Sequence, residues 1–158
     1  MPARKMREFL NKNDIRYVTV QHSPAFTAQA VAASAHVPSK EMGKTVMLDI
    51  DGKMAMAVLP SSFQVNFDQL KEALNAGSIS LMHERDFKDR FPDCEPGAMP
   101  PFGNLYGMPV FVAESLAEDE YIAFSAGSHH EVVLMTYADY QRLVAPSIVQ
   151  FTTEILSV

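Results

Sequence analysis

The chain contains very little cysteine and no long apolar segment. Cys94 is the only cysteine among the 158 residues, so an internal disulfide bond is excluded and a reducing compartment is favoured. No apolar run approaches the roughly 20 residues of a membrane-spanning helix. Residues 1–8 lack the apolar core of a signal peptide. These absences predict a cytoplasmic protein that makes no contact with a membrane.

The motifs of familiar catalytic and metal sites are also missing. There is no Gly-x-Ser-x-Gly elbow, no Walker A loop and no Gly-x-Gly-x-x-Gly fingerprint. Cys94 lies between Asp93 and Glu95, whose negative charges raise the pKa of a thiol and argue against a nucleophilic cysteine. His129 and His130 are adjacent in a predicted turn, but no further ligand stands at a metal-binding spacing. Neither a metal nor a cofactor is therefore expected.

Positive charge is scarce and unevenly distributed. The formal net charge is −6. Residues 1–53 hold eight Lys or Arg and five Asp or Glu, a net of +3, whereas residues 54–158 hold five and fourteen, a net of −9. A protein that grips nucleic acid over an extended surface normally has a basic footprint, so DNA binding is not expected. The basic N-terminal third is either a local RNA contact or the solvated face of a helix.

Size and hydrophobic patterning predict one domain over residues 1–158. A length of 158 residues suits one core, and 47% hydrophobic residues with 20% charged residues is typical of a globular protein. Helices are predicted over 2–13, 27–36, 67–75, 83–91 and 136–144. Strands are predicted over 16–22, 44–49, 53–59, 79–81, 109–112, 121–125 and 131–135, with an extended tail at 148–151. Because hairpins interrupt the alternation of strands and helices, we expect a mixed α/β fold with a partly closed sheet flanked by helices.

Short local signals predict three element boundaries. Thr27 is an expected helix N-cap, since its hydroxyl can accept from an amide of the first turn. Asp51-Gly52, between two apolar runs, predicts a two-residue β-hairpin. Gly77 is expected to end the helix over 67–75.

A proline-rich loop is predicted over residues 96–103. It holds three of the ten prolines and two of the seven glycines. Proline fixes φ and lacks an N–H, which excludes a helix interior or a central strand. Glycine permits positive φ and close backbone approach. The segment is therefore a stiff loop that either connects surface elements or holds a ligand through its amides.

Two other segments could join this loop in a site. Lys44 follows Gly43 at the start of an apolar strand, where it is either solvated or, if it faces a cleft, able to bind a phosphate as a point charge. A glycine-bearing turn at 124–129 follows another predicted strand. That turn matters for function only if it faces the proline-rich loop.

Four segments in order carry a family resemblance. They are Pro24-Ala25-Phe26-Thr27, Gly43-Lys44-Thr45-Val46, the loop 96–103 and Ser125-Ala126-Gly127. Together they resemble the bacterial aminoacyl-tRNA deacylases of the YbaK/EbsC type, which are related to the editing domain inserted in bacterial prolyl-tRNA synthetases. The resemblance covers nearly the whole chain, and it is the loop combined with the strand-opening lysine that makes it specific. It implies one mixed α/β domain around a curved, barrel-like sheet.

The resemblance also implies an activity, namely hydrolysis in trans of the ester between a mischarged amino acid and the terminal adenosine of tRNA. Lys44 matches a lysine that the family requires for activity and that contacts the 3′ end of the substrate. Gly97 and Gly127 match glycines that line the aminoacyl pocket. These three residues are therefore the expected catalytic residues. No side-chain nucleophile is needed, because a positioned water and backbone N–H groups on the oxyanion can suffice.

The expected partner is the 3′ acceptor end of aminoacyl-tRNA, with an aminoacyl-tRNA synthetase as a further partner. Nine residues are expected to bind the substrate: Phe26, Thr45, Met47, Pro100, Pro101, Phe102, Gly103, Ser125 and His129. His129 either donates to the substrate or is a structural turn residue. Small apolar differences supply only about 1–3 kcal/mol of discrimination. The sequence does not choose among alanine, serine, threonine, cysteine or another amino acid.

Two other functions remain open at this point. One is a non-catalytic module that binds aminoacyl-adenosine or nucleotide ligands and docks on a synthetase. The other is a regulator that binds DNA or RNA, against which the net charge of −9 over residues 54–158 counts.

Overall fold

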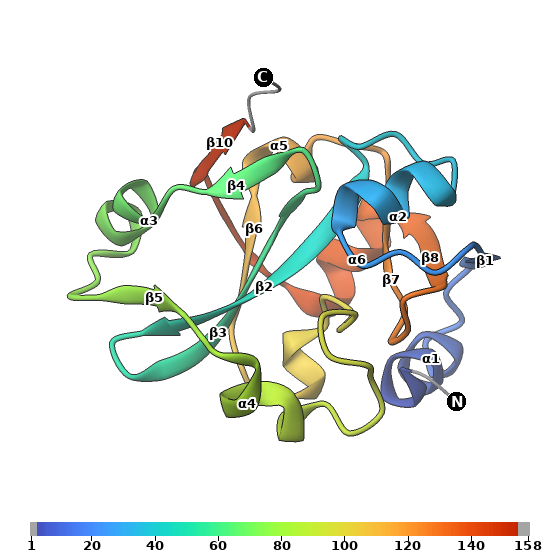
Figure 1. Ribbon diagram of the computed structural model, residues 1–158, viewed down its shortest axis with the longest axis horizontal. Helices are drawn as coiled ribbons and strands as arrows, with labels where there is room; N and C mark the ends of the chain where they lie inside the picture. Colours follow the sequence, from blue (N-terminus) through green and yellow to red (C-terminus); the bar gives the residue numbers. More distant parts are fainter. Residues whose placement is uncertain (1–2, 155–158) are drawn as a thin grey trace.

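A curved mixed sheet forms the centre of the computed structural model, which describes residues 3–154 (Figure 1). Eight strands belong to it: β1 (Val18–Gln21), β2 (Met42–Ile50), β3 (Lys53–Pro60), β5 (Ile79–Leu81), β6 (Val110–Ala113), β7 (Tyr121–Ser125), β8 (Glu131–Thr136) and β9 (Ser147–Val149). Their order is β1-β8-β7-β2-β3-β6-β9, and β5 pairs with β2 beside this path. The mixed α/β prediction is confirmed. The sheet is open, since its path has two ends, and it is not a closed barrel.

The pairing combines parallel and antiparallel strands. β2 with β7, β3 with β6, and β6 with β9 are parallel, and the remaining pairs are antiparallel. The predicted hairpin between β2 and β3 is confirmed, because both Asp51 (φ 51°) and Gly52 (φ 84°) have the positive φ of a type I′ turn. A separate antiparallel pair is formed by β4 (Phe63–Val65) and β10 (Thr152–Glu154).

Helices cover both faces of the sheet. They are α1 (Arg4–Lys12), α2 (Ala28–Ser34), α3 (Phe67–Leu74), α4 (Glu84–Phe87), α5 (Glu114–Ala117) and α6 (Tyr137–Val144). On β7, Phe124 packs in the large core that includes α1 and α6, whereas Ala123 packs on the opposite face beneath α2. α3 packs on the outer side of β2 and β3 through Leu70. Within residues 3–154, no helix is long and apolar enough to cross a membrane.

Most predicted element boundaries agree with the structure to within a few residues. Thr27 caps α2 as expected, since its Oγ1 accepts from the Ala30 N–H at 3.1 Å. The helix predicted over 83–91 is α4 followed by a 3-10 turn at Lys88–Arg90. The strands β4 and β10 and the helix α5 were not predicted; each has only three or four residues, too few for a periodic pattern. Residue 2, where the first helix was expected to begin, lies outside the described residues.

The predicted role of Gly77 is wrong. α3 ends instead at Asn75, which has the left-handed conformation (φ 52°) that closes a helix. The Gly77 N–H donates to the Asp51 carboxylate oxygens, at 2.9 and 3.1 Å. A Cβ at position 77 would lie 2.9 Å from Asp51 Oδ1. The glycine therefore permits a close contact between the α3–β5 loop and the β2–β3 hairpin.

Candidate functional site

The candidate site begins where two parallel strands separate. β2 pairs with β7 only through Met42 and Gly43, and the same edge of β2 next gains a partner at Leu48, in β5. Residues 44–46 therefore border a gap in the sheet. A split between neighbouring strands of an open α/β sheet is a common place for a ligand crevice.

The main chain of Thr45 faces this gap. Along β2, the Met42 carbonyl accepts from Ser61 on the β3 side, whereas the Met47 carbonyl accepts from the Met82 N–H on the opposite edge. Main-chain groups alternate between the two edges of a strand. The N–H and carbonyl of Thr45 therefore point to the same edge as those of Met47, just beyond the last pair with β7. The gap thus has a backbone donor and a backbone acceptor on one wall.

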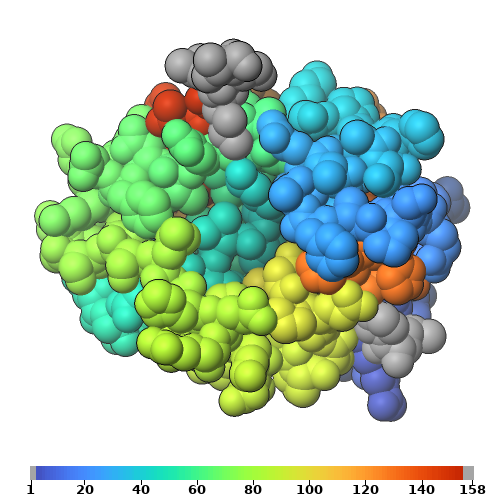
Figure 2. All heavy atoms as spheres, in the orientation of Figure 1, coloured from blue at the N-terminus to red at the C-terminus, as the bar shows by residue number. Residues whose placement is uncertain are grey.

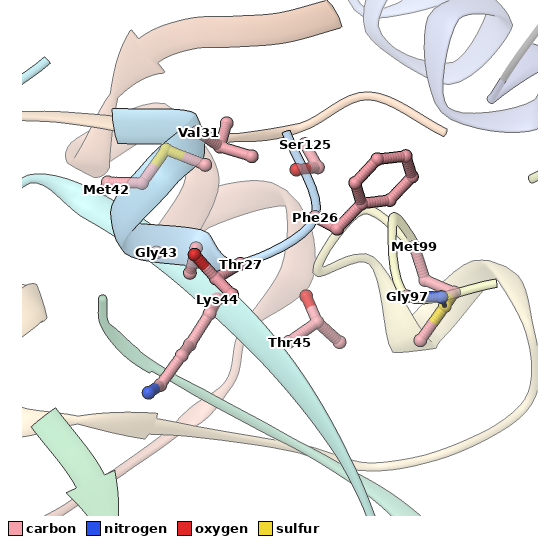
Figure 3. A pocket seen from close by; sticks show the side chains of 11 residues that line it. Phe26, Thr27, Val31, Met42, Gly43, Lys44, Thr45, Gly97, Met99 and Ser125 are labelled. Carbon is pink, nitrogen blue, oxygen red and sulfur yellow. Dashed lines mark hydrogen bonds between the residues drawn. The ribbon is translucent and has the colours of Figure 1, made fainter. Parts of the chain in front are cut away.

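A small pocket of about 180 Å³ occupies this gap (Figure 3). Eleven residues line it: Phe26, Thr27, Ala28, Val31, Met42, Gly43, Lys44, Thr45, Gly97, Met99 and Ser125. They come from α2 and the turn before it, β2, the proline-rich loop and the end of β7. In Figure 2 the blue α2 segment borders the yellow proline-rich loop, with the orange β7–β8 turn between them. The volume lies below the roughly 300–1,000 Å³ of drug-sized sites, so it suits a group the size of an aminoacyl moiety.

Lys44 closes one end of the pocket. Its side chain leaves β2 on the α2 face, and its ammonium points away from Gly97 and Met99 (Figure 3). The described residues offer this ammonium neither a carboxylate nor a hydrogen-bond partner. Partial burial lowers its pKa below the ordinary lysine value. Within residues 3–154, Lys44 is therefore a cation without a partner, available to an anionic or polar ligand that spans the pocket.

Gly97 forms part of the opposite wall. Its φ of +86° is a conformation that L-residues rarely adopt. Its N–H donates to the Sδ atom of Met99 at 3.2 Å. The proline-rich loop thus places a glycine amide at the pocket, as expected, but a thioether already occupies that amide.

Gly127 lies beside the pocket and does not line it. Its N–H donates to the Ala98 carbonyl at 2.9 Å, and its carbonyl accepts from the Glu95 N–H at 2.7 Å. Both main-chain groups are therefore used to dock the proline-rich loop onto the β7–β8 turn. The turn does face the loop, and both main-chain groups of Gly127 hold the loop against it; the expected catalytic role of Gly127 stays a prediction.

Phe26 and His129 form a ring pair at the mouth of the pocket. Phe26 is 77% exposed, and its ring centroid lies 4.8 Å from that of His129. His129 Nε2 lies 2.9 Å from the Pro96 carbonyl oxygen, which can only accept, so Nε2 carries a proton. The His129 N–H also donates to Glu95. These bonds favour the structural alternative for His129, which supports Phe26 from outside the pocket lining.

Five residues expected in the substrate pocket belong to the core instead: Met47, Pro100, Pro101, Phe102 and Gly103. The ring of Phe102 is fully buried and packs against those of Phe124 and Tyr140, with centroids 5.5 Å away in each case. A Cβ at Gly103 would lie 2.6 Å from Val110 Cγ2, so this glycine permits close packing, and it does not line the pocket.

Six residues that line the pocket were not predicted: Thr27, Ala28, Val31, Met42, Gly43 and Met99. Thr27, Gly43 and Met99 lie within the segments that carried the family resemblance. Each is within two residues of a predicted site residue, so its position in the sequence could have indicated a place in the pocket lining. Val31 and Met42 carry no such signal, because apolar residues in a helix and a strand usually pack in a core.

Comparisons with known proteins identify the family of this chain. The family model described as aminoacyl-tRNA editing domain matches residues 22–143. The multifunctional Ser/Thr-tRNA deacylase ProXp-y of Escherichia coli K12 is 27% identical over 144 residues, covering 87% of this chain and 84% of that protein. The same protein from Escherichia coli O157:H7 matches equally.

Solved structures show the same fold. The protein APE2540 superposes with a TM-score of 0.83 at 15% identity, covering 94% of this chain and 99% of that one. A candidate trans-editing enzyme for prolyl tRNA synthetase superposes with a TM-score of 0.80 at 12% identity, covering 96% of each chain. The family match confirms the resemblance and the enzyme class expected with it, an aminoacyl-tRNA deacylase. The chain belongs to the family of aminoacyl-tRNA editing domains.

Proposed function

We propose that this chain hydrolyses, in trans, the ester bond that joins an amino acid to the 3′-terminal adenosine of a mischarged tRNA. The products are the free amino acid and the tRNA. The observation that carries the proposal is that Lys44, Gly97 and Ser125, from three separate sequence segments, line one small pocket. Membership of the editing family supports it independently.

The lining favours catalysis by positioning. Thr45 and Ser125 bring hydroxyl groups to the pocket, but among residues 3–154 no histidine, aspartate or glutamate lines it to act as a base for them. An aminoacyl ester is reactive, so orienting a water molecule and stabilising the oxyanion can suffice. In this proposal the N–H groups of Thr45 and Gly97 are the oxyanion donors. The vicinal ribose hydroxyl of the substrate assists the attack.

The positions of the two ends suggest how the substrate lies. Lys44 holds a phosphate or the ribose at one end of the pocket, because its ammonium has no partner among the described residues. The aminoacyl group then lies between Thr45, Gly97 and Ser125. Loss of the Lys44 charge should therefore weaken turnover much more than folding.

We further propose serine or threonine as the amino acid removed. The cavity of about 180 Å³ accepts only a small side chain, and its lining combines apolar Val31 and Met42 with the hydroxyl groups of Thr45 and Ser125. The curated relatives named as Ser/Thr-tRNA deacylases point to the same choice. A cytoplasmic setting and an aminoacyl-tRNA synthetase partner remain parts of the proposal.

A panel of mischarged tRNAs tests this proposal. The wild-type protein, a Lys44→Ala variant and a Lys40→Ala variant are each incubated with tRNAs that carry serine, threonine, alanine or cysteine. Lys40 is exposed and outside the pocket, so its variant makes the same change of charge without touching the site. We expect rapid release of serine or threonine by the wild type and Lys40→Ala, and at least a tenfold slower release by Lys44→Ala. Equal rates for the wild type and Lys44→Ala on every tRNA would disprove the proposal.

A non-catalytic binding module is the second candidate. It is favoured by one observation, namely that Lys44 is the only ionisable side chain lining the pocket in the part of the chain that the structure describes. This alternative predicts that aminoacyl-adenosine analogues bind while hydrolysis of every mischarged tRNA stays at the uncatalysed rate.

A further inference from the structure

The sulfur of Met99 accepts a hydrogen bond from the Gly97 N–H, the backbone amide that the proposed reaction needs. Gly97 has positive φ, which turns its N–H toward the Met99 Sδ atom at 3.2 Å. Met99 lines the same pocket and is only 4% exposed (Figure 3). The loop around this contact is held in place, because the Ala98 carbonyl accepts from the Gly127 N–H. The contact is therefore built into the pocket wall.

A thioether is a weak hydrogen-bond acceptor, and an ester carbonyl or a developing oxyanion is a stronger one. The methionine side chain has three rotatable bonds, so its sulfur can leave the amide while the loop backbone stays in place. Exchange of the sulfur for a ligand oxygen is therefore favoured.

We propose that the Met99 thioether is an internal cap on the Gly97 amide and is displaced by the carbonyl oxygen of the bound ligand. The ligand's identity as an aminoacyl ester rests on the proposed function. In the free protein the cap keeps the Gly97 N–H pointing into the pocket. On binding, the N–H···S bond is exchanged for an N–H···O bond, so groups that offer no oxygen to Gly97 do not displace the cap. Met99 is thus a specificity-determining residue.

The pocket supplies a matched control for this proposal. Met42 also lines the pocket and is 1% exposed, but no described donor is bonded to its sulfur. Replacement of methionine by leucine conserves volume and removes the sulfur. Met99→Leu therefore uncaps an amide, whereas Met42→Leu changes the same wall and uncaps nothing.

The test combines NMR of the Gly97 amide with binding of a non-hydrolysable probe, 3′-(L-serylamino)-3′-deoxyadenosine. In the free protein, Met99→Leu should shift the Gly97 amide proton and speed its exchange with water several-fold, while Met42→Leu should do neither. Met99→Leu should also bind the probe about two- to fivefold more tightly and lower KM on the cleaved aminoacyl-tRNA without lowering kcat. An unchanged Gly97 amide in Met99→Leu, or equal probe affinities for the two variants, would overturn the proposal.

If Met99→Leu fails to fold, an NMR titration of the wild-type protein with the probe still tests whether the ligand displaces the Met99 sulfur. Addition of the probe should move the Gly97 amide proton together with those of Thr45 and Ser125. A probe that moves Thr45 and Ser125 but leaves Gly97 unchanged overturns the cap and the role of Gly97 as an oxyanion donor, but it leaves the proposed hydrolysis intact. A probe that moves none of them overturns both.

Discussion

Removal of the Tyr140 hydroxyl is expected to destabilise the protein by about 2 kcal/mol. Tyr140, on α6, is fully buried, and its hydroxyl donates to the Pro101 carbonyl at 2.6 Å. Burial raises its pKa well above the ordinary tyrosine value, as expected for a phenol among apolar groups such as Phe102. This bond ties α6 to the proline-rich loop.

The magnitude follows from what Tyr140→Phe leaves behind. Phenylalanine fills the same space, so no large cavity forms, but the Pro101 carbonyl loses its partner in an apolar environment. An unsatisfied buried acceptor costs about 1–3 kcal/mol. In a domain of this size each kcal/mol lowers Tm by roughly 2–4 °C, so a decrease of about 6 °C is expected.

Tyr137→Phe is the matched control. It makes the same chemical change one turn earlier in α6, where the hydroxyl donates to Gln141 Oε1 at 2.6 Å. Gln141 is only half-buried and can turn to water, so its oxygen is not stranded and a loss of about 0.5 kcal/mol is expected.

Urea denaturation of both variants gives the two free energies of unfolding directly. Equal slopes with different midpoints would confirm that only stability changed. The reasoning fails if Tyr140→Phe is as stable as Tyr137→Phe.

Two further predictions concern the loop and the lysine. Gly103→Ala should cost about 1–3 kcal/mol in urea denaturation, because its Cβ would lie 2.6 Å from Val110 Cγ2 and 2.9 Å from the Met108 carbonyl oxygen; wild-type stability would contradict this. Burial lowers the pKa of Lys44, so affinity for the serylamino probe should decrease as the pH rises, and this decrease should begin at a lower pH than an ordinary lysine would give. Lys44→Arg should bind without this alkaline decrease, since guanidinium stays charged; the same decrease in Lys44→Arg would contradict the assignment. As the pH rises, Lys44 loses its proton at a lower pH in the folded protein than in the unfolded chain, so the stability of the wild-type protein should increase over that pH range.

The sequence by itself determined the features that depend on near neighbours. A hydroxyl at Thr27 caps α2 through an amide three residues away, and Asp51-Gly52 forms its turn through its own φ angles. The four short motifs were sufficient for the family resemblance, because each keeps its residue types within a few positions. They also led to Lys44, Gly97 and Ser125, which the pocket brings together.

Only the tertiary structure decided which groups in those motifs face the ligand. Phe102 and Met47 were predicted in the pocket wall, but they turn into the core formed by elements distant in the sequence. The gap itself exists because β2 separates from β7 after two paired residues. The Gly127 N–H is already hydrogen-bonded because the proline-rich loop, distant in the sequence, packs against it. Side-chain and amide directions of this kind depend on strand register and on the packing of remote segments, which no local pattern of residues specifies.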